Sequence, residues 1–272
     1  METSFSVVLN TFERSSRNSD LKRSFKSIIK QSLKPKELII VNSGDKKLYL
    51  DLITKYKKKK NFTIKIVNCS KKTNISQAKN IGAKNCKFSF LAFLDDDDAW
   101  GINYLKKSKK FILKNNAEII LSYVYSELKE KTILFKKPES QKLSDFFNYN
   151  TGAMGSNLII SKKKFNLVKG FDAKLITGED KGIIMDLIIK KEIIFFQKNF
   201  VYYNMITPNS ITKQPLKVIE GVSAFYKKYK NHMPVKNKVF VLMRIHSFKK
   251  KINKIYFFSF LILFILNKIL NL

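Results

Sequence analysis

The stretch Phe88-Ser89-Phe90-Leu91-Ala92-Phe93-Leu94 runs directly into Asp95-Asp96-Asp97-Asp98-Ala99-Trp100. A nearly continuous apolar run is typical of a strand that is buried on both faces of a parallel sheet. The four carboxylates would then lie at the carboxyl end of that strand, where open α/β sheets bind ligands. Because closely packed carboxylates repel one another, a hard divalent cation is their natural partner. A solvated acidic turn is the alternative interpretation.

Strand-like and helical segments alternate along the first hundred residues. The apolar pattern predicts strands at residues 5–9, 37–41, 62–67 and 88–94. Helical spacing of apolar residues predicts helices at 20–31, 49–56 and 74–85. Such alternation indicates βαβ units and a parallel sheet. The polar loops that follow the first two strands should therefore meet the acid run at one edge of the sheet.

The second half of the chain shows a more mixed order of strand-like and helical segments. Strand candidates lie at residues 118–124, 132–135, 157–160, 193–196 and 200–203, and a helix begins near Glu179 and Asp180. We expect a catalytic domain over residues 1–210, with a nucleotide-binding part at 1–100 and an acceptor part at 101–210. A helical extension, basic and apolar, would follow over residues 211–272.

The net charge of +32 would attract phosphates, nucleic acid or an anionic membrane surface. Only four of the 53 basic residues are arginine, however, and proteins that read bases rely on arginine. Nucleic acid is therefore not an expected partner, although a basic nucleic-acid-binding protein remains an alternative. The two cysteines, Cys69 and Cys86, lack metal-ligand spacing. The first residues show no secretory signal, so a cytoplasmic location is expected.

The last part of the chain combines positive charge with an apolar run. Residues 255–266 contain no charge, and they follow Lys249, Lys250, Lys251 and Lys254. Twelve residues are fewer than the roughly twenty that a membrane-spanning helix needs. The segment is therefore predicted to dock on an anionic membrane surface, at the inner face of the cell membrane. A terminal helix that completes the core or binds a partner protein is the alternative.

Four motifs, in order over about residues 5–210, give the chain a resemblance to the family 2 glycosyltransferases. The first two are strand ends with their loops, at residues 6–14 and 35–45. The third joins residues 76–83 to the acid run, and the fourth is Gly170-Phe171-Asp172 followed by Gly178-Glu179-Asp180. The resemblance implies an α/β fold of the GT-A type, a Rossmann-like nucleotide-sugar-binding domain with a mostly parallel sheet.

The resemblance also implies a metal-dependent, inverting transfer of a sugar. The donor would be a nucleoside-diphosphate sugar, and the acceptor a hydroxyl of a glycan or lipid-linked molecule in surface polysaccharide synthesis. Asp95 and Asp97 match the two acids that hold Mn²⁺ or Mg²⁺ in the family. Asp180 matches the general base, with Glu179 as the next candidate. Glu179 and Trp100 are expected to contact the acceptor. The alternative for Glu179 and Asp180 is that they only cap a helix.

The implied nucleotide contacts come from the loops after the first strands and from the third motif. They are Asn10, Thr11, Phe12, Glu13, Arg14, Ser43, Lys79 and Asp96. The chain departs from the family at Asn42-Ser43, where an Asp pair is common, and at Lys79, where Arg is usual. Residues 207–210 lack the histidine that is often a third metal ligand. A nucleotidyltransferase of related fold is a further alternative, but the first loop lacks that class's glycines.

Overall fold

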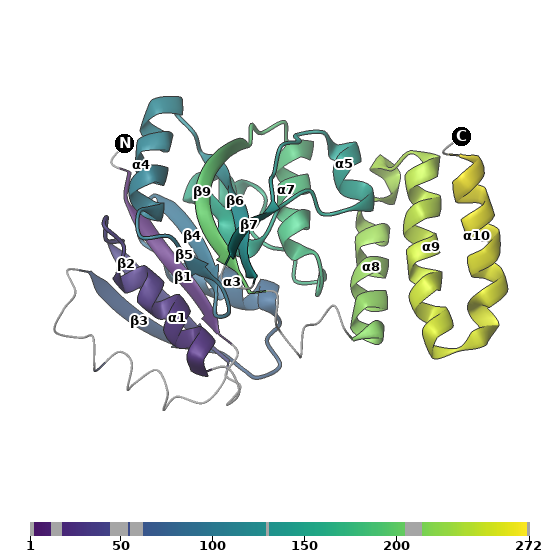
Figure 1. Ribbon diagram of the computed structural model, residues 1–272, viewed down its shortest axis with the longest axis horizontal. Helices are drawn as coiled ribbons and strands as arrows, with labels where there is room; N and C mark the ends of the chain where they lie inside the picture. The colour runs from purple at the N-terminus through teal and green to yellow at the C-terminus, as the bar shows by residue number, and fades with distance from the viewer. Residues whose placement is uncertain are drawn as a thin grey trace.

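The computed structural model describes residues 3–11, 18–43, 54, 62–128, 131–204 and 214–270. The predicted helix at 49–56 lies outside the described residues apart from Thr54, and so do residues 207–210. A central sheet carries helices on both faces, and three helices at the carboxyl-terminal end of the chain extend to one side (Figure 1).

Nine strands form the sheet, and most of them run parallel. The first four have the order β3-β2-β1-β4 and are parallel, and they comprise β1 (Phe5–Thr11), β2 (Glu37–Asn42), β3 (Thr63–Asn68) and β4 (Phe90–Asp95). The sheet continues with β8 (Leu158–Ser161), β6 (Ile119–Leu128), β9 (Phe195–Tyr203) and β5 (Ala99–Trp100), and β7 (Lys131–Lys136) pairs with β6. Only β8, β5 and β7 pair exclusively in the antiparallel sense. The predicted α/β fold with a mostly parallel sheet is confirmed.

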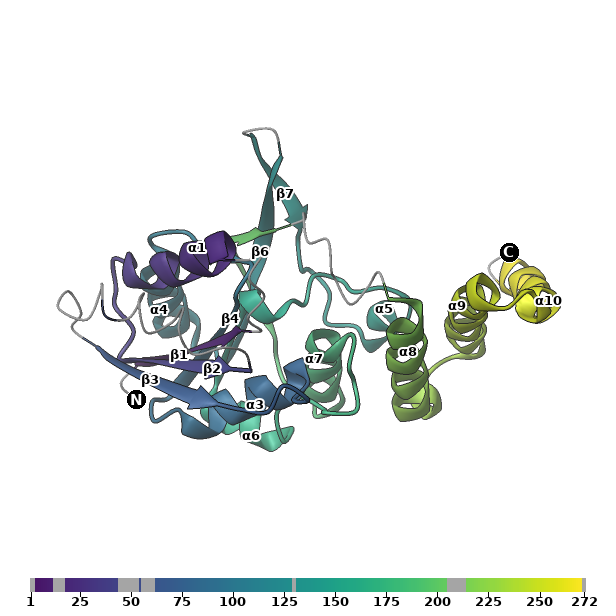
Figure 2. The ribbon, with the colours of Figure 1, turned by 90° about the horizontal axis from the view of Figure 1, so that it is seen from below.

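The buried strands separate two layers of core, because successive side chains of a strand point to opposite faces. Val7 and Leu9 of β1 pack with α1 (Asn18–Ile29) and α4 (Tyr104–Asn115). Val8 packs on the other face, which is covered by α3 (Ile75–Asn85), α6 (Lys162–Leu167) and α7 (Glu179–Ile189). Figure 2 shows the two groups of helices on opposite sides of the sheet.

Helix α3 is fixed closely against the strands. Its first turn has a capping box, in which the Asn74 side chain accepts from Gln77 N–H and the Gln77 side chain accepts from Asn74 N–H. Gly82 allows the close approach, because a Cβ there would lie 2.3 Å from Cγ1 of Val8 and 2.9 Å from Cγ2 of Val41. The buried face of α3 therefore points at the sheet, and Lys79 is part of that face.

Two features of the second half differ from the sequence prediction. The separate strands expected at 193–196 and 200–203 are one strand, β9. The polar residue Asn199 does not break it, because its buried amide donates to Tyr104 O at 3.0 Å and to Ser108 Oγ at 3.3 Å. Helix α4 was not predicted. Its many lysines conceal a narrow buried stripe, formed by Tyr104, Leu105, Ser108 and Ile112.

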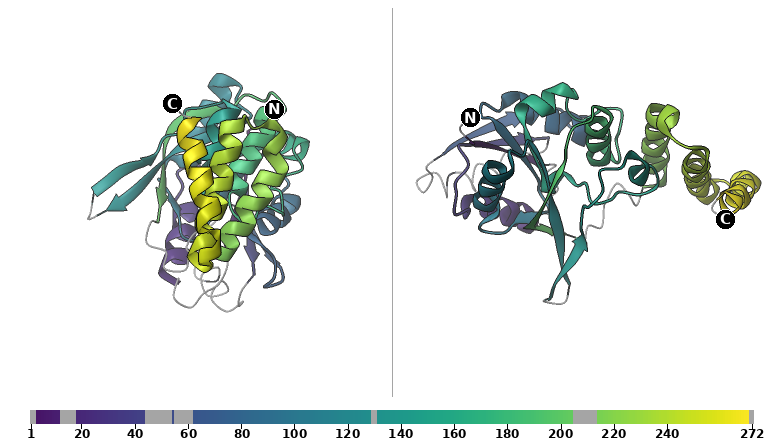
Figure 3. Two further views of the ribbon diagram at one scale, coloured as in Figure 1. Left: turned by 90° about the vertical axis from the view of Figure 1, so that its right-hand side faces the viewer. Right: turned by 90° about the horizontal axis from the view of Figure 1, so that it is seen from above.

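The predicted carboxyl-terminal helical extension is present. It consists of α8 (Pro215–Tyr229), α9 (Val235–Ile252) and α10 (Phe257–Ile269), which lie side by side (Figure 3). The short α5 (Leu143–Asn148) packs against α9. The hydroxyl of Tyr229 joins α8 to α7, because it donates to Gly182 O at 3.0 Å and contacts Asp186 Oδ1 at 2.9 Å. Among the described residues, no helix has the length and hydropathy needed to span a bilayer.

Candidate active site

The carboxyl ends of β1, β2 and β4 meet at one edge of the sheet. Asn10 faces Asp95 across the pair of β1 and β4, and Thr11 faces Asn42 across the pair of β1 and β2. Ser43 binds Thr11 O through its backbone N–H at 3.2 Å and through its hydroxyl at 3.1 Å. Three of the residues predicted to contact a nucleotide, Asn10, Thr11 and Ser43, therefore lie together beside the acid run. Phe12, Glu13 and Arg14 lie outside the described residues.

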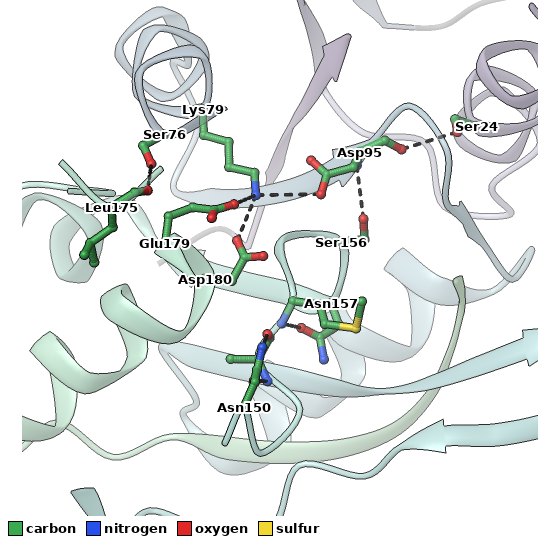
Figure 4. A network of polar contacts seen from close by, with 12 residues as sticks. Ser24, Ser76, Lys79, Asp95, Asn150, Ser156, Asn157, Leu175, Glu179 and Asp180 are labelled. Carbon is green, nitrogen blue, oxygen red and sulfur yellow. Dashed lines mark hydrogen bonds and ion pairs between the residues drawn. The ribbon is translucent and has the colours of Figure 1, made fainter. Parts of the chain in front are cut away.

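A fully buried ammonium organises the acids at this edge. Lys79 Nζ lies 2.8 Å from Asp180 Oδ1, 3.1 Å from Glu179 Oε1 and 3.7 Å from Asp95 Oδ2 (Figure 4). The four side chains come from α3, from the first turn of α7 and from the end of β4. Sequence reasoning placed Lys79 at the nucleotide. In the structure its side chain is enclosed and its charge is directed at three carboxylates.

Burial and the opposite charges nearby shift the pKa values of this cluster in opposite directions. Burial alone would lower the pKa of Lys79, but the charges of Asp180, Asp95 and Glu179 raise it well above its usual range. Burial raises the pKa of Asp95 to about 6 and that of Glu179 to about 7, although Lys79 pulls both values down. Among the described residues, one ammonium therefore faces three carboxylates, and burial favours the neutral form of Asp95 and Glu179.

The turn Gly155–Asn157 (η3) closes over the cluster, and sequence reasoning missed it. A Cβ on Gly155 would lie 2.3 Å from Lys79 Nζ and 3.1 Å from Asp95 Oδ2, so glycine alone leaves room for the ion pair. Ser156 Oγ accepts from Asp95 N–H at 3.1 Å. The only signal in the sequence was a Gly-Ser-Asn turn directly before a predicted strand.

Trp100 of β5 holds this turn by a hydrogen bond. Its indole Nε1 donates to Ser156 O at 2.8 Å, and its ring stacks on Tyr104 with centroids 4.6 Å apart. The residue is 3% exposed. This placement corrects the expectation that Trp100 contacts the acceptor, because the large apolar ring fills the core between β5 and α4 instead.

Side chains of α1 hold the acid run by hydrogen bonds to its backbone carbonyl groups. Ser24 Oγ donates to Asp98 O, and the Arg23 guanidinium donates to Asp97 O. The Asp98 carboxylate is buried and accepts from Asn204 N–H at 3.2 Å. Burial, with Asp97 and Asp95 nearby, raises the pKa of Asp98 well above its usual range. Hydrogen bonds from α1 and from Asn204 thus hold the backbone and one carboxylate of this loop in place.

Asp95 and Asp97 provide some, but not all, of the ligands that a divalent cation needs. Oδ1 of Asp95 is buried without a hydrogen-bond partner in the described part of the chain, and Asp97 is partly exposed. Carboxylate oxygens are the ligands that Mg²⁺ and Mn²⁺ prefer. Within the described ranges, no group of three or more His, Cys, Asp or Glu residues is arranged as a complete metal site. Further ligands would have to come from a bound phosphate or water.

Solved structures of known proteins share this fold. TarS residues 1–349 of S. aureus, solved with UDP-GlcNAc, align with a TM-score of 0.63 and 15% identity, over 90% of this chain and 81% of that chain. The complex of the same protein with UDP gives a TM-score of 0.60 and 16% identity, over 92% and 73% of the two chains. At these identities the likeness shows a shared fold.

A curated relative is the poly(ribitol-phosphate) beta-N-acetylglucosaminyltransferase TarP of Staphylococcus aureus (strain N315). It is 26% identical over 213 residues, which are 74% of this chain and 62% of that protein. The chain thus spans less than two thirds of its length. Residues 6–175 match the model of Glycosyl transferase family 2. That match covers more than half of the 272 residues and includes the strand ends and the acid run, so the protein belongs to glycosyl transferase family 2.

Proposed function

We propose that the protein transfers a sugar from a nucleoside-diphosphate sugar to a hydroxyl of a cell-wall or other surface polymer, with inversion at the anomeric carbon. The cluster of Asp95, Glu179 and Asp180 around Lys79 carries the proposal. The names of TarP and of the TarS complex support UDP-GlcNAc as the donor to test and a phosphate-containing polymer as the acceptor class. Nothing in the site favours nucleotidyl transfer or nucleic-acid binding.

Asp180 is the proposed general base. The ion pair with Lys79 holds one carboxylate oxygen, Oδ1, and the side chain remains 21% exposed. The second oxygen can take the proton of the acceptor hydroxyl while that hydroxyl oxygen attacks the anomeric carbon. The bond from this carbon to the diphosphate breaks in the same displacement, and the nucleoside diphosphate leaves with the electron pair. The Glu179 side chain is more buried than that of Asp180 and pairs with the same ammonium of Lys79. This placement suits a positioning role.

Asp95 and Asp97 would hold Mn²⁺ or Mg²⁺ when the donor binds. Such a cation supplies neutralisation of the charge that develops on the leaving diphosphate. The chain's own contribution is the rigid loop, whose backbone is bound by Ser24 and Arg23. Asp96 and the strand ends at Asn10 and Thr11 would line the nucleotide side of the site.

Asp180→Asn should stop transfer and leave donor binding nearly intact, because the amide keeps the shape but cannot accept the proton. Turnover should fall by a factor of about a hundred or more. Transfer is measured with UDP-GlcNAc and a polyol-phosphate polymer, and donor affinity by calorimetry. Asp145→Asn, an exposed acid on α5, is the matched control and should act like the wild type. Turnover of Asp180→Asn within a few-fold of wild type would assign the base elsewhere, first to Glu179.

Asp97→Ala should remove the part of the affinity for UDP that depends on Mn²⁺. The physical reason is that two carboxylates plus phosphate oxygens form a minimal oxygen site, and one carboxylate does not. Calorimetric titration of UDP with Mn²⁺ and with a chelator measures the difference. An unchanged Mn²⁺-dependent affinity in the variant would contradict the metal assignment, and Asp145→Ala serves as the charge-matched control.

We also propose that α10 docks on an anionic membrane surface, which would bring the enzyme to a membrane-linked acceptor. The helix packs beside α9 and buries none of its residues. Phe258, Ile262 and Ile265 lie on one side of it and are 74%, 60% and 50% exposed. Contiguous apolar surface of this kind is typical of an interaction site. Positive charge surrounds it, and no acidic residue follows Glu220. Membrane docking suits this combination.

A variant with Phe258→Ser, Ile262→Ser and Ile265→Ser should lose flotation with vesicles of phosphatidylglycerol, because insertion of the apolar side chains supplies the anchoring. The control replaces Ile102, Leu113 and Ile193 by Ser, since these residues are equally exposed but lie on the catalytic domain. The control should float like the wild type. Equal flotation of all three proteins, or none by the wild type, would contradict membrane docking by α10.

A further inference from the structure

Three lysines form a row along the exposed side of α1. Lys22 and Lys26 lie in α1, and Lys30 directly follows its last residue, where its N–H still donates to Lys26 O at 2.9 Å. With a spacing of four residues, the three follow one side of the helix at intervals of about 6 Å. All three are exposed, and none forms an ion pair with another described residue. Like charges at this spacing repel each other. Within the described ranges, the row therefore offers three ammonium groups in a line without an acidic partner.

The row borders a shallow groove, open to solvent, of about 500 Å³. The groove is lined by Ser19, Lys22, Arg23, Lys26, Ser27, Lys30 and Ala99. Four of these seven residues are cations, two carry hydroxyls and none is acidic. Such a lining supplies many hydrogen-bond donors and positive charge, and a ligand with several negative oxygens is the chemical class that it fits.

Arg23 connects the groove to the catalytic loop. Its guanidinium donates to Asp97 O, and its Nε is buried without a hydrogen-bond partner in the described part of the chain. The Arg23 side chain is itself partly exposed and lines the groove, so its charge adds to that of the lysine row. Ala99, which also lines the groove, directly follows the acid run. A chain of anions bound along α1 would therefore pass next to the site of transfer.

We propose that this groove binds successive phosphate groups of the polymer acceptor, and this inference rests on the proposed function. The lysine row would hold the polymer backbone, while Arg23 would bind the phosphate next to the catalytic loop. The lining includes no large apolar side chain, which disfavours insertion into a bilayer. The groove is thus distinct from α10, where exposed apolar residues dominate.

The test compares two triple variants with equal changes in charge. The first is Lys22→Gln, Lys26→Gln, Lys30→Gln. The control is Lys106→Gln, Lys110→Gln, Lys114→Gln, because these lysines of α4 are exposed and have the same spacing. The probe is inorganic polyphosphate, and binding to the full chain is measured at several salt concentrations. Thermal unfolding of each variant checks that the exposed substitutions leave the fold intact.

The α1 variant should bind polyphosphate about tenfold more weakly or worse near 0.1 M salt, with a salt dependence shallower by about two to three counterions. The α4 variant should change affinity less than about threefold. Equal losses in both variants would show that polyphosphate responds only to net charge and would overturn the proposal. An unchanged affinity of the α1 variant for polyphosphate would also overturn the proposal. The same holds if the α1 variant loses flotation with vesicles while its affinity for polyphosphate is unchanged.

The polyphosphate measurement does not depend on turnover, so it stands apart from the proposed function. In transfer assays with a polyol-phosphate polymer, the α1 variant should raise KM and leave kcat close to wild type. A wild-type protein that binds polyphosphate through α1 but transfers no sugar would contradict the proposed function alone. Normal transfer with an unchanged KM in the α1 variant would contradict the groove alone.

Discussion

The buried ammonium of Lys79 is the constraint on which the rest of the site depends. Its charge is removed from water and stabilised by carboxylates from two other elements, at distances between 2.8 and 3.7 Å. A buried charge without such partners would cost several kcal/mol. Helix α3, the start of α7 and the end of β4 are therefore held at fixed positions relative to one another, and these three elements carry the proposed base and metal ligands.

The surrounding structure accommodates this ion cluster in detail. Gly82 brings α3 close to β1, and Gly155 leaves space for the ammonium beneath η3. Trp100 and Ser24 then fix the loops on either side by side chain to backbone hydrogen bonds. The result is a site with an excess of negative charge inside a strongly basic protein. The acids suit the proposed divalent cation with its phosphate ligand, and the basic surface suits the proposed anionic polymer.

Much of the fold could be predicted because β1, β2 and β4 are continuous apolar runs that end in polar loops. The convergence of Asp95 with Asn10 followed from the geometry of parallel strands. Helix α4 was missed because five of its twelve residues are lysines, and its burial depends on a narrow stripe. The pairing of Lys79 with Glu179 and Asp180 could not be predicted, since these two residues lie about a hundred residues away and ion pairing leaves no local pattern. Trp100 was misplaced because adjacency to an acid run does not show whether a ring faces the core.

A double-mutant cycle on the buried pair tests the central claim most directly. Lys79→Met should destabilise the fold by about 3–5 kcal/mol, because it leaves buried carboxylates without their cation. Asp180→Asn made in the Lys79→Met background should cost far less than in the wild type, or should stabilise. Urea unfolding of the four proteins gives the coupling free energy, with Lys84→Met on the exposed side of α3 as the control. A coupling above about 1 kcal/mol is predicted, whereas additivity within about 0.5 kcal/mol would contradict the account.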